Sequence, residues 1–81
     1  MSHYVVINDW ATNDAEGVDI IAVKHTLEEA KEIFNKQVTN EKEFAKEHEY
    51  EIFEDTDVMF DAGETGYWAA EHTKLYIQGV V

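Results

Sequence analysis

A stripe of apolar side chains at helical spacing follows Thr26 and constrains the fold more than any other feature. Its first members are Leu27, Ala30, Ile33, Phe34 and Val38. Thr26 with Glu29 three residues later forms a capping box, which predicts that a helix begins here. The stripe weakens over residues 39–41 and resumes at Phe44, so the pattern predicts either one continuous helix or a helix kinked at this point. An amphipathic helix has to bury its stripe against another element.

The other apolar segments have the pattern of strands. Residues 3–11 and 17–25 are rich in β-branched side chains and are joined by a turn-rich link, which predicts a hairpin before the helix. Near the other end of the chain, residues 67–72 and 75–81 are expected to form two closing strands joined at 72–74.

A further hairpin is predicted directly after the helix. Its apolar residues stand at even positions and its carboxylates mostly at odd ones; the apolar residues are Tyr50, Ile52, Val58 and Phe60. A turn over residues 55–57 keeps the two faces separate, and it would place Ile52 opposite Phe60 and Glu51 opposite Asp61.

These elements predict a two-layer α+β domain, in which an antiparallel sheet of four to five strands packs on one helix in the order β-β-α-β-β-β. The 81 residues form one domain. Without cysteine the domain has no disulfide to stabilise it, so a homodimer or a tight partner would add stability. The first residues lack a basic leader and every apolar run is too short to span a membrane, which indicates a soluble, cytoplasmic protein.

The charge of the chain limits its partners. It has 18 acidic residues against six lysines, no arginine, and a net charge of −12. Direct binding of nucleic acid is therefore not expected, because it requires a positive surface and commonly arginine; anionic membranes are disfavoured for the same reason. The natural partners of such a surface are basic proteins or cations.

Most of the negative charge is concentrated in residues 41–64, where ten acids and two lysines give a net charge of −8. We predict that a partner is bound by carboxylates of this region with a tryptophan as anchor; the candidates are Glu49, Glu51, Asp55, Asp57, Asp61, Glu64 and Trp68. Alternate residues of a strand lie about 6.6–6.8 Å apart, close to the spacing of neighbouring phosphates, so this row could mimic nucleic acid. The alternative interpretation is that the carboxylates only keep the protein soluble and protect sheet edges.

Motifs for catalysis or for a bound metal are not found. The segment that begins Asp55-Thr-Asp57 lacks the glycine and the final glutamate of a calcium loop, and the four histidines are scattered. No catalytic residue, metal site or cofactor is predicted, and we expect a protein that is not an enzyme. The second hypothesis is a small-ligand or cation-binding domain that could form a dimer and that uses residues 57–64 with His72.

In size and charge the chain resembles small acidic α+β proteins of phages and mobile elements, such as anti-restriction and anti-CRISPR inhibitors. The resemblance rests on no individual motif. It implies an interaction module that inhibits a basic DNA- or RNA-handling protein by mimicking nucleic acid.

Overall fold

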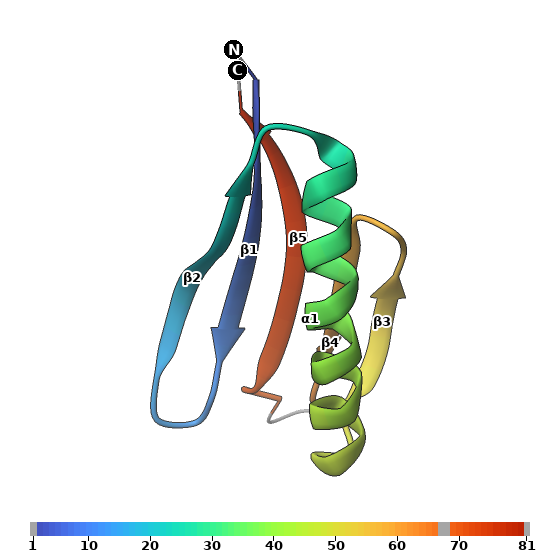
Figure 1. Cartoon of the computed structure of the whole chain (residues 1–81). Helices are drawn as coiled ribbons and strands as arrows, with labels where there is room; N and C mark the ends of the chain where they lie inside the picture. Colours follow the sequence, from blue (N-terminus) through green and yellow to red (C-terminus); the bar gives the residue numbers. More distant parts are fainter. Residues whose placement is uncertain (1, 67–68, 81) are drawn as a thin grey trace.

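The computed structural model describes residues 2–66 and 69–80, and it consists of a helix packed on an antiparallel sheet (Figure 1). The elements are β1 (His3–Ala11), β2 (Glu16–Lys24), α1 (Leu27–Glu47), β3 (Glu51–Asp55), β4 (Met59–Gly63) and β5 (His72–Val80). The α+β architecture, the single helix and the order of the elements confirm the predicted fold.

The five strands lie in the order β2-β1-β5-β4-β3, and each neighbouring pair is antiparallel. The last strand, β5, thus lies between a hairpin that precedes the helix and a hairpin that follows it (Figure 1). It pairs with β1 along its whole length, from His3 opposite Val80 to Ala11 opposite His72. The two hairpins become one sheet only through β5.

Four large side chains that are fully buried form the centre of the core: Val6, Phe34, Phe60 and Leu75. Phe34 comes from α1, and the other three come from β1, β4 and β5. Ala30, Val38 and Ala45 of α1 are buried as well, so the stripe predicted from the sequence is the face that packs on the sheet.

The helix is continuous from Leu27 to Glu47, which resolves the two predicted alternatives. Thr26 is the N-cap, and its hydroxyl oxygen accepts a hydrogen bond from the backbone N–H of Glu29 at 3.2 Å. The same hydroxyl donates to the carboxylate of Glu29 at 3.0 Å, so both residues of the predicted capping box are engaged.

The end of the chain differs from the prediction. One strand, β5, takes the place of the two closing strands, and it already begins at His72. Residues 72–74 do not turn, because Thr73 and Lys74 continue the pairing with β1 opposite Trp10 and Asp9. Of the predicted strand at 67–72, residues 67–68 lie outside the described residues and 69–71 are not part of a strand.

The predicted register of the β3–β4 hairpin is wrong. Ile52 lies opposite Ala62 instead of Phe60, and Asp61 lies opposite Glu54 instead of Glu51. The register shifts between Ile52 and Glu54, so Phe53 forms a bulge that alternation alone does not predict.

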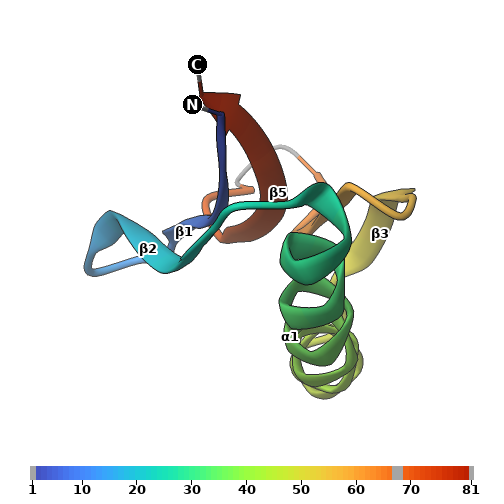
Figure 2. The same cartoon turned by 45° about the horizontal axis from the view of Figure 1, so that its top comes forward.

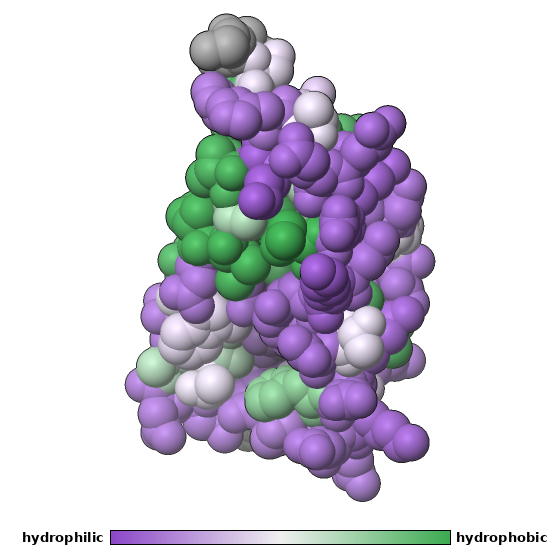
Figure 3. Space-filling view, viewed as in Figure 1, coloured by the Kyte–Doolittle hydropathy of each residue, from purple (hydrophilic) through white to green (hydrophobic). Residues whose placement is uncertain are grey.

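One face of the sheet has no helix on it in the described part of the chain. Figure 2 shows α1 beside β5 while the β1–β2 hairpin extends to the other side. On the helix side, Figure 3 shows hydrophilic side chains over α1 and a patch of apolar side chains over β2 next to it. In the described residues no helix is long and apolar enough to cross a membrane.

The core assignment predicts different outcomes for two phenylalanines. Phe34 is fully buried, whereas Phe53 is 53 % exposed. Phe34→Ala should lower the free energy of unfolding by about 3–5 kcal/mol, which is comparable with the whole stability of so small a domain. Phe53→Ala should change it by less than about 0.5 kcal/mol. Urea denaturation followed by circular dichroism measures both, and equal losses would contradict this core.

Candidate functional site

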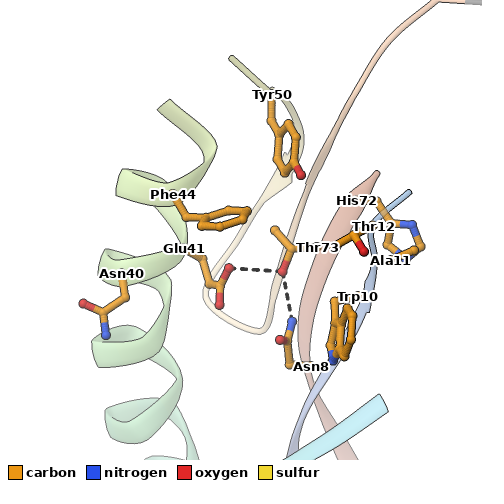
Figure 4. A pocket seen from close by; sticks show the side chains of 10 residues that line it. All are labelled: Asn8, Trp10, Ala11, Thr12, Asn40, Glu41, Phe44, Tyr50, His72 and Thr73. Carbon is orange, nitrogen blue, oxygen red and sulfur yellow. Dashed lines mark hydrogen bonds between the residues drawn. The ribbon is translucent and has the colours of Figure 1, made fainter. Parts of the chain in front are cut away.

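A cleft of about 370 Å³ lies between the C-terminal half of α1 and the adjacent ends of β1 and β5 (Figure 4). It is lined by Asn8, Trp10, Ala11, Thr12, Asn40, Glu41, Phe44, Tyr50, His72 and Thr73. Three of these residues are large aromatics and one is a carboxylate. None of the lining residues that the structure describes is a lysine.

Glu41 brings its carboxylate into this cleft because it stands on the apolar face of α1. Phe34, Val38 and Ala45 are buried on that face, and Glu41 takes the place between Val38 and Ala45 where a further apolar residue would be expected. The weakening of the stripe at residues 39–41 therefore marks a polar site in a straight helix. It does not mark a kink.

Buried polar groups hold the Glu41 carboxylate in place. The side chain of Asn8 donates to the hydroxyl oxygen of Thr73 at 3.0 Å, and this hydroxyl donates to Oε2 of Glu41 at 3.1 Å. Gln37 donates to Oε1 at 3.2 Å. Because Asn8 and Thr73 are only 9 % and 3 % exposed, these hydrogen bonds fix the orientation of the carboxylate before any ligand arrives.

The end of α1 places Tyr50 against Phe44. The N–H of Tyr50 donates to the carbonyl of Ala45 and the N–H of Glu49 to that of Lys46, which together form a Schellman motif. Glu49 occupies the left-handed position of this motif, at φ 56°, where glycine is usual. The rings of Tyr50 and Phe44 then meet edge to face, with 5.7 Å between their centroids.

Trp10 forms the sheet side of the cleft. Its indole N–H donates to Asp19 on the neighbouring strand at 2.9 Å. The ring lies over Gly17, where a Cβ atom would come within 2.9 Å of the indole Cζ2. Gly17 thus lets the indole lie flat on β2 and fixes it at the cleft.

Tyr50 donates a hydrogen bond of 2.9 Å to Oε1 of Glu71. Burial of the phenol, followed by this hydrogen bond and the charges of Glu71 and Glu64, raises the pKa of Tyr50 to about 12. The phenol therefore stays neutral at physiological pH.

Two of the predicted partner-binding carboxylates are paired with lysines of α1. Asp55 lies 2.9 Å from Lys42, and Asp57 lies 2.9 Å from Lys31. The hydrogen bond from Lys31 lowers the pKa of Asp57 below its ordinary value. The charges of these two residues are therefore partly neutralised by lysines of α1.

The remaining predicted residues lie apart from one another. Glu49 follows the C-cap residue of α1, and Glu51 begins β3 on the face without the helix, opposite Gly63. Asp61 is in the middle of β4 opposite Lys74, and Glu64 accepts a hydrogen bond from the N–H of Glu71. Trp68 lies outside the described residues. The bulge at Phe53 also turns Glu51 and Asp55 to opposite faces, so the described carboxylates do not form a single row.

Residues 57–64 do not close around a common point. Asp57 precedes β4, Asp61 lies within it and Glu64 follows it, and His72 Nε2 lies 3.4 Å from Asp9 instead. Among the described residues, no three histidine, aspartate or glutamate side chains are arranged to hold a metal ion.

Comparisons with protein-family models, with curated proteins and with solved structures gave no match to this chain.

The sequence alone did not predict that Asn8, Trp10 and Glu41 come together at one cleft. The signal that could have revealed them is polarity at positions expected to be buried. Asn8 alternates with Val6 and Trp10 in β1, and Glu41 interrupts the helical stripe. Where two elements both carry a polar residue on their core face, the two faces are expected to meet at a polar site.

The left-handed conformation of Glu49 predicts a stabilising substitution. Glu49→Gly should raise the free energy of unfolding by up to about 1 kcal/mol, because a side chain at positive φ costs more than the added flexibility of glycine. Glu47→Gly, inside the last turn of the helix, removes the same charge and should instead lower it by about 1 kcal/mol. Urea denaturation measures the free energy of unfolding of both variants. Destabilisation by Glu49→Gly would contradict the left-handed conformation of residue 49.

The pKa of Tyr50 can be measured by tyrosinate absorbance. One of the four tyrosines should titrate near pH 12, and Tyr50→Phe should remove this late phase. Since the pKa is raised above its ordinary value of 10.0, the stability that this group contributes is complete below pH 10 and declines as the pH rises towards 12. Circular dichroism at each pH shows whether the protein is still folded. A wild-type titration identical to that of Tyr50→Phe would refute the assignment.

Proposed function

We propose that this protein is a non-enzymatic interaction module that binds a basic partner protein, with a lysine or arginine side chain of the partner entering the cleft. The observation that carries the proposal is the position of the Glu41 carboxylate among Trp10, Phe44 and Tyr50. Aromatic faces attract cations, and a carboxylate beside them completes a site for a cationic side chain.

Two electrostatic effects support this proposal at different distances. The net charge of −12 attracts a basic protein over several ångströms and raises the rate of encounter. At contact, Glu41 is already oriented by Thr73 and Gln37, so the site loses little conformational entropy when it binds. The long-range attraction should weaken as the salt concentration rises, whereas the contact in the cleft depends on Glu41.

The class of partner that we propose is a protein that handles DNA or RNA, because such proteins carry dense lysine and arginine surfaces. In this form of the proposal the protein inhibits its partner by competing with nucleic acid. The scattered, partly paired carboxylates of residues 49–64 would then supply a general negative field, and the cleft would supply the specific contact.

A second candidate function is the binding of a small organic cation in the same cleft. Its volume of about 370 Å³ lies within the range of small-molecule sites. A quaternary ammonium ion fits the aromatic lining and the carboxylate without any partner protein.

The proposal predicts which glutamate of α1 matters. Calorimetric titration with an oligolysine peptide should show that Glu41→Gln weakens binding about tenfold or more, and that Phe44→Ala weakens it about five- to tenfold. Glu43→Gln removes the same charge from an exposed position of the same helix and should weaken binding less than about twofold.

Equal effects of Glu41→Gln and Glu43→Gln would show that the peptide senses only net charge, and the cleft proposal would fail. Tetramethylammonium distinguishes the two candidate functions. If it binds the cleft as tightly as the peptide, with the same loss in Glu41→Gln, the small-ligand function is favoured. Competition between the protein and duplex DNA for a basic DNA-binding protein then tests whether the protein inhibits its partner by displacing nucleic acid.

A further inference from the structure

The strand β2 is composed like an inner strand but lies at the edge of the sheet. Its exposed side chains include Val18, Ile20 and Val23, which are 61 %, 59 % and 55 % exposed. Edge strands of soluble proteins are usually short or protected by proline or central lysines. β2 has nine residues and no proline, and its single lysine stands at the end.

The apolar surface continues from β2 onto β1. Ile20 lies opposite Ile7 and Val23 opposite Val5, and all four side chains point to the sheet face that the helix does not cover. This face follows from β1, where Val6 points towards the helix, so Val5 and Ile7 point away from it. The result is an apolar patch next to an unpaired strand edge in the described part of the chain.

From this edge we infer that the protein forms a symmetric dimer, in which the β2 strands of two copies pair antiparallel and join the two sheets into one. A second copy fits this edge because β2 is complementary to itself. A two-fold axis between Ile21 and Ala22 places Asp19 of each copy opposite Lys24 of the other, and Ile20 opposite Val23.

The pairing of β1 with β2 shifts register between Val6 and Ile7, so Ile21 is a bulged residue in β2. Because of this bulge, the residues paired across the two-fold axis point to the same face of the sheet. In a regular strand, residues 19 and 24 would point to opposite sides. Here the register shift places Asp19 opposite Asn8 and Lys24 opposite Tyr4, both on the helix side. Each oppositely charged pair thus lies on one face, and each Ile20–Val23 pair lies on the other.

The distribution of charge also favours pairing through β2. The strand itself carries a net charge of −1, from Glu16, Asp19 and Lys24. The other edge strand, β3, belongs to the segment of net charge −8 and is separated from β2 by three strands. Two copies that meet through β2 therefore keep their most negative regions far apart, whereas β3 edges would bring carboxylates together.

Light scattering coupled to size exclusion tests this dimer over micromolar to millimolar protein concentrations. The wild-type protein should have twice the mass of one chain. Ile20→Lys should reduce the mass to that of one chain, since it places two lysines within the apolar part of the interface. Phe53→Lys introduces the same charge at the equally exposed β3 edge and should leave the dimer intact.

A charge exchange tests the register. Lys24→Asp should weaken the dimer about tenfold or more, and the double variant Asp19→Lys with Lys24→Asp should restore it to within about threefold. Circular dichroism confirms that each variant is folded. The inference is overturned if the wild-type protein is monomeric throughout, if Ile20→Lys remains dimeric, if Phe53→Lys alone dissociates it, or if the double variant is no tighter than Lys24→Asp.

Discussion

The structure depends on the packing of one helix against a sheet that is wider than the helix. Five strands about 4.8 Å apart span about 19 Å, whereas a helix with its side chains is about 10–12 Å wide. Phe34 therefore anchors α1 on the central strands, where it meets Val6, Phe60 and Leu75. The parts of the sheet that α1 does not reach have to carry polar side chains, be covered by other parts of the chain, or remain exposed where a partner can bind.

The areas beyond the helix contact differ in chemistry across the sheet. At the β3–β4 side, lysines of α1 reach over to Asp55 and Asp57 and reduce a dense negative charge. At one end of α1, Glu41 and its hydrogen-bonded partners border an aromatic cleft. At the opposite edge of the sheet, β2 exposes apolar side chains and carries a net charge of only −1. In the two proposals, the basic partner would bind between α1, β1 and β5, and the second copy would bind at the edge of β2.

Periodicity sufficed to predict the helix and the first two strands, because the stripe after Thr26 and the β-branched runs reflect burial directly. It failed where local geometry departs from regular alternation. The bulge at Phe53 moved Asp55 to the helix side, and the alternating carboxylates therefore do not share one face. The cleft was not predicted because it forms where α1, β1 and β5 meet, and a pattern within one segment does not report which polar residues of distant segments come together. Glu41 and Asn8 can be recognised as parts of one site only when the three-dimensional structure shows that they lie close together.

The central position of β5 also determines how the chain acquires its structure. The two hairpins and the helix contain local contacts and can begin to form independently. The core cannot form independently, because Leu75 lies on the last strand. In addition, the β1–β5 ladder joins His3 to Val80 across almost the whole chain. Such non-local pairing requires closure of a long loop and slows folding relative to a helical protein of equal length. During synthesis on the ribosome, the apolar stripe of α1 consequently stays without its full cover until β5 has emerged.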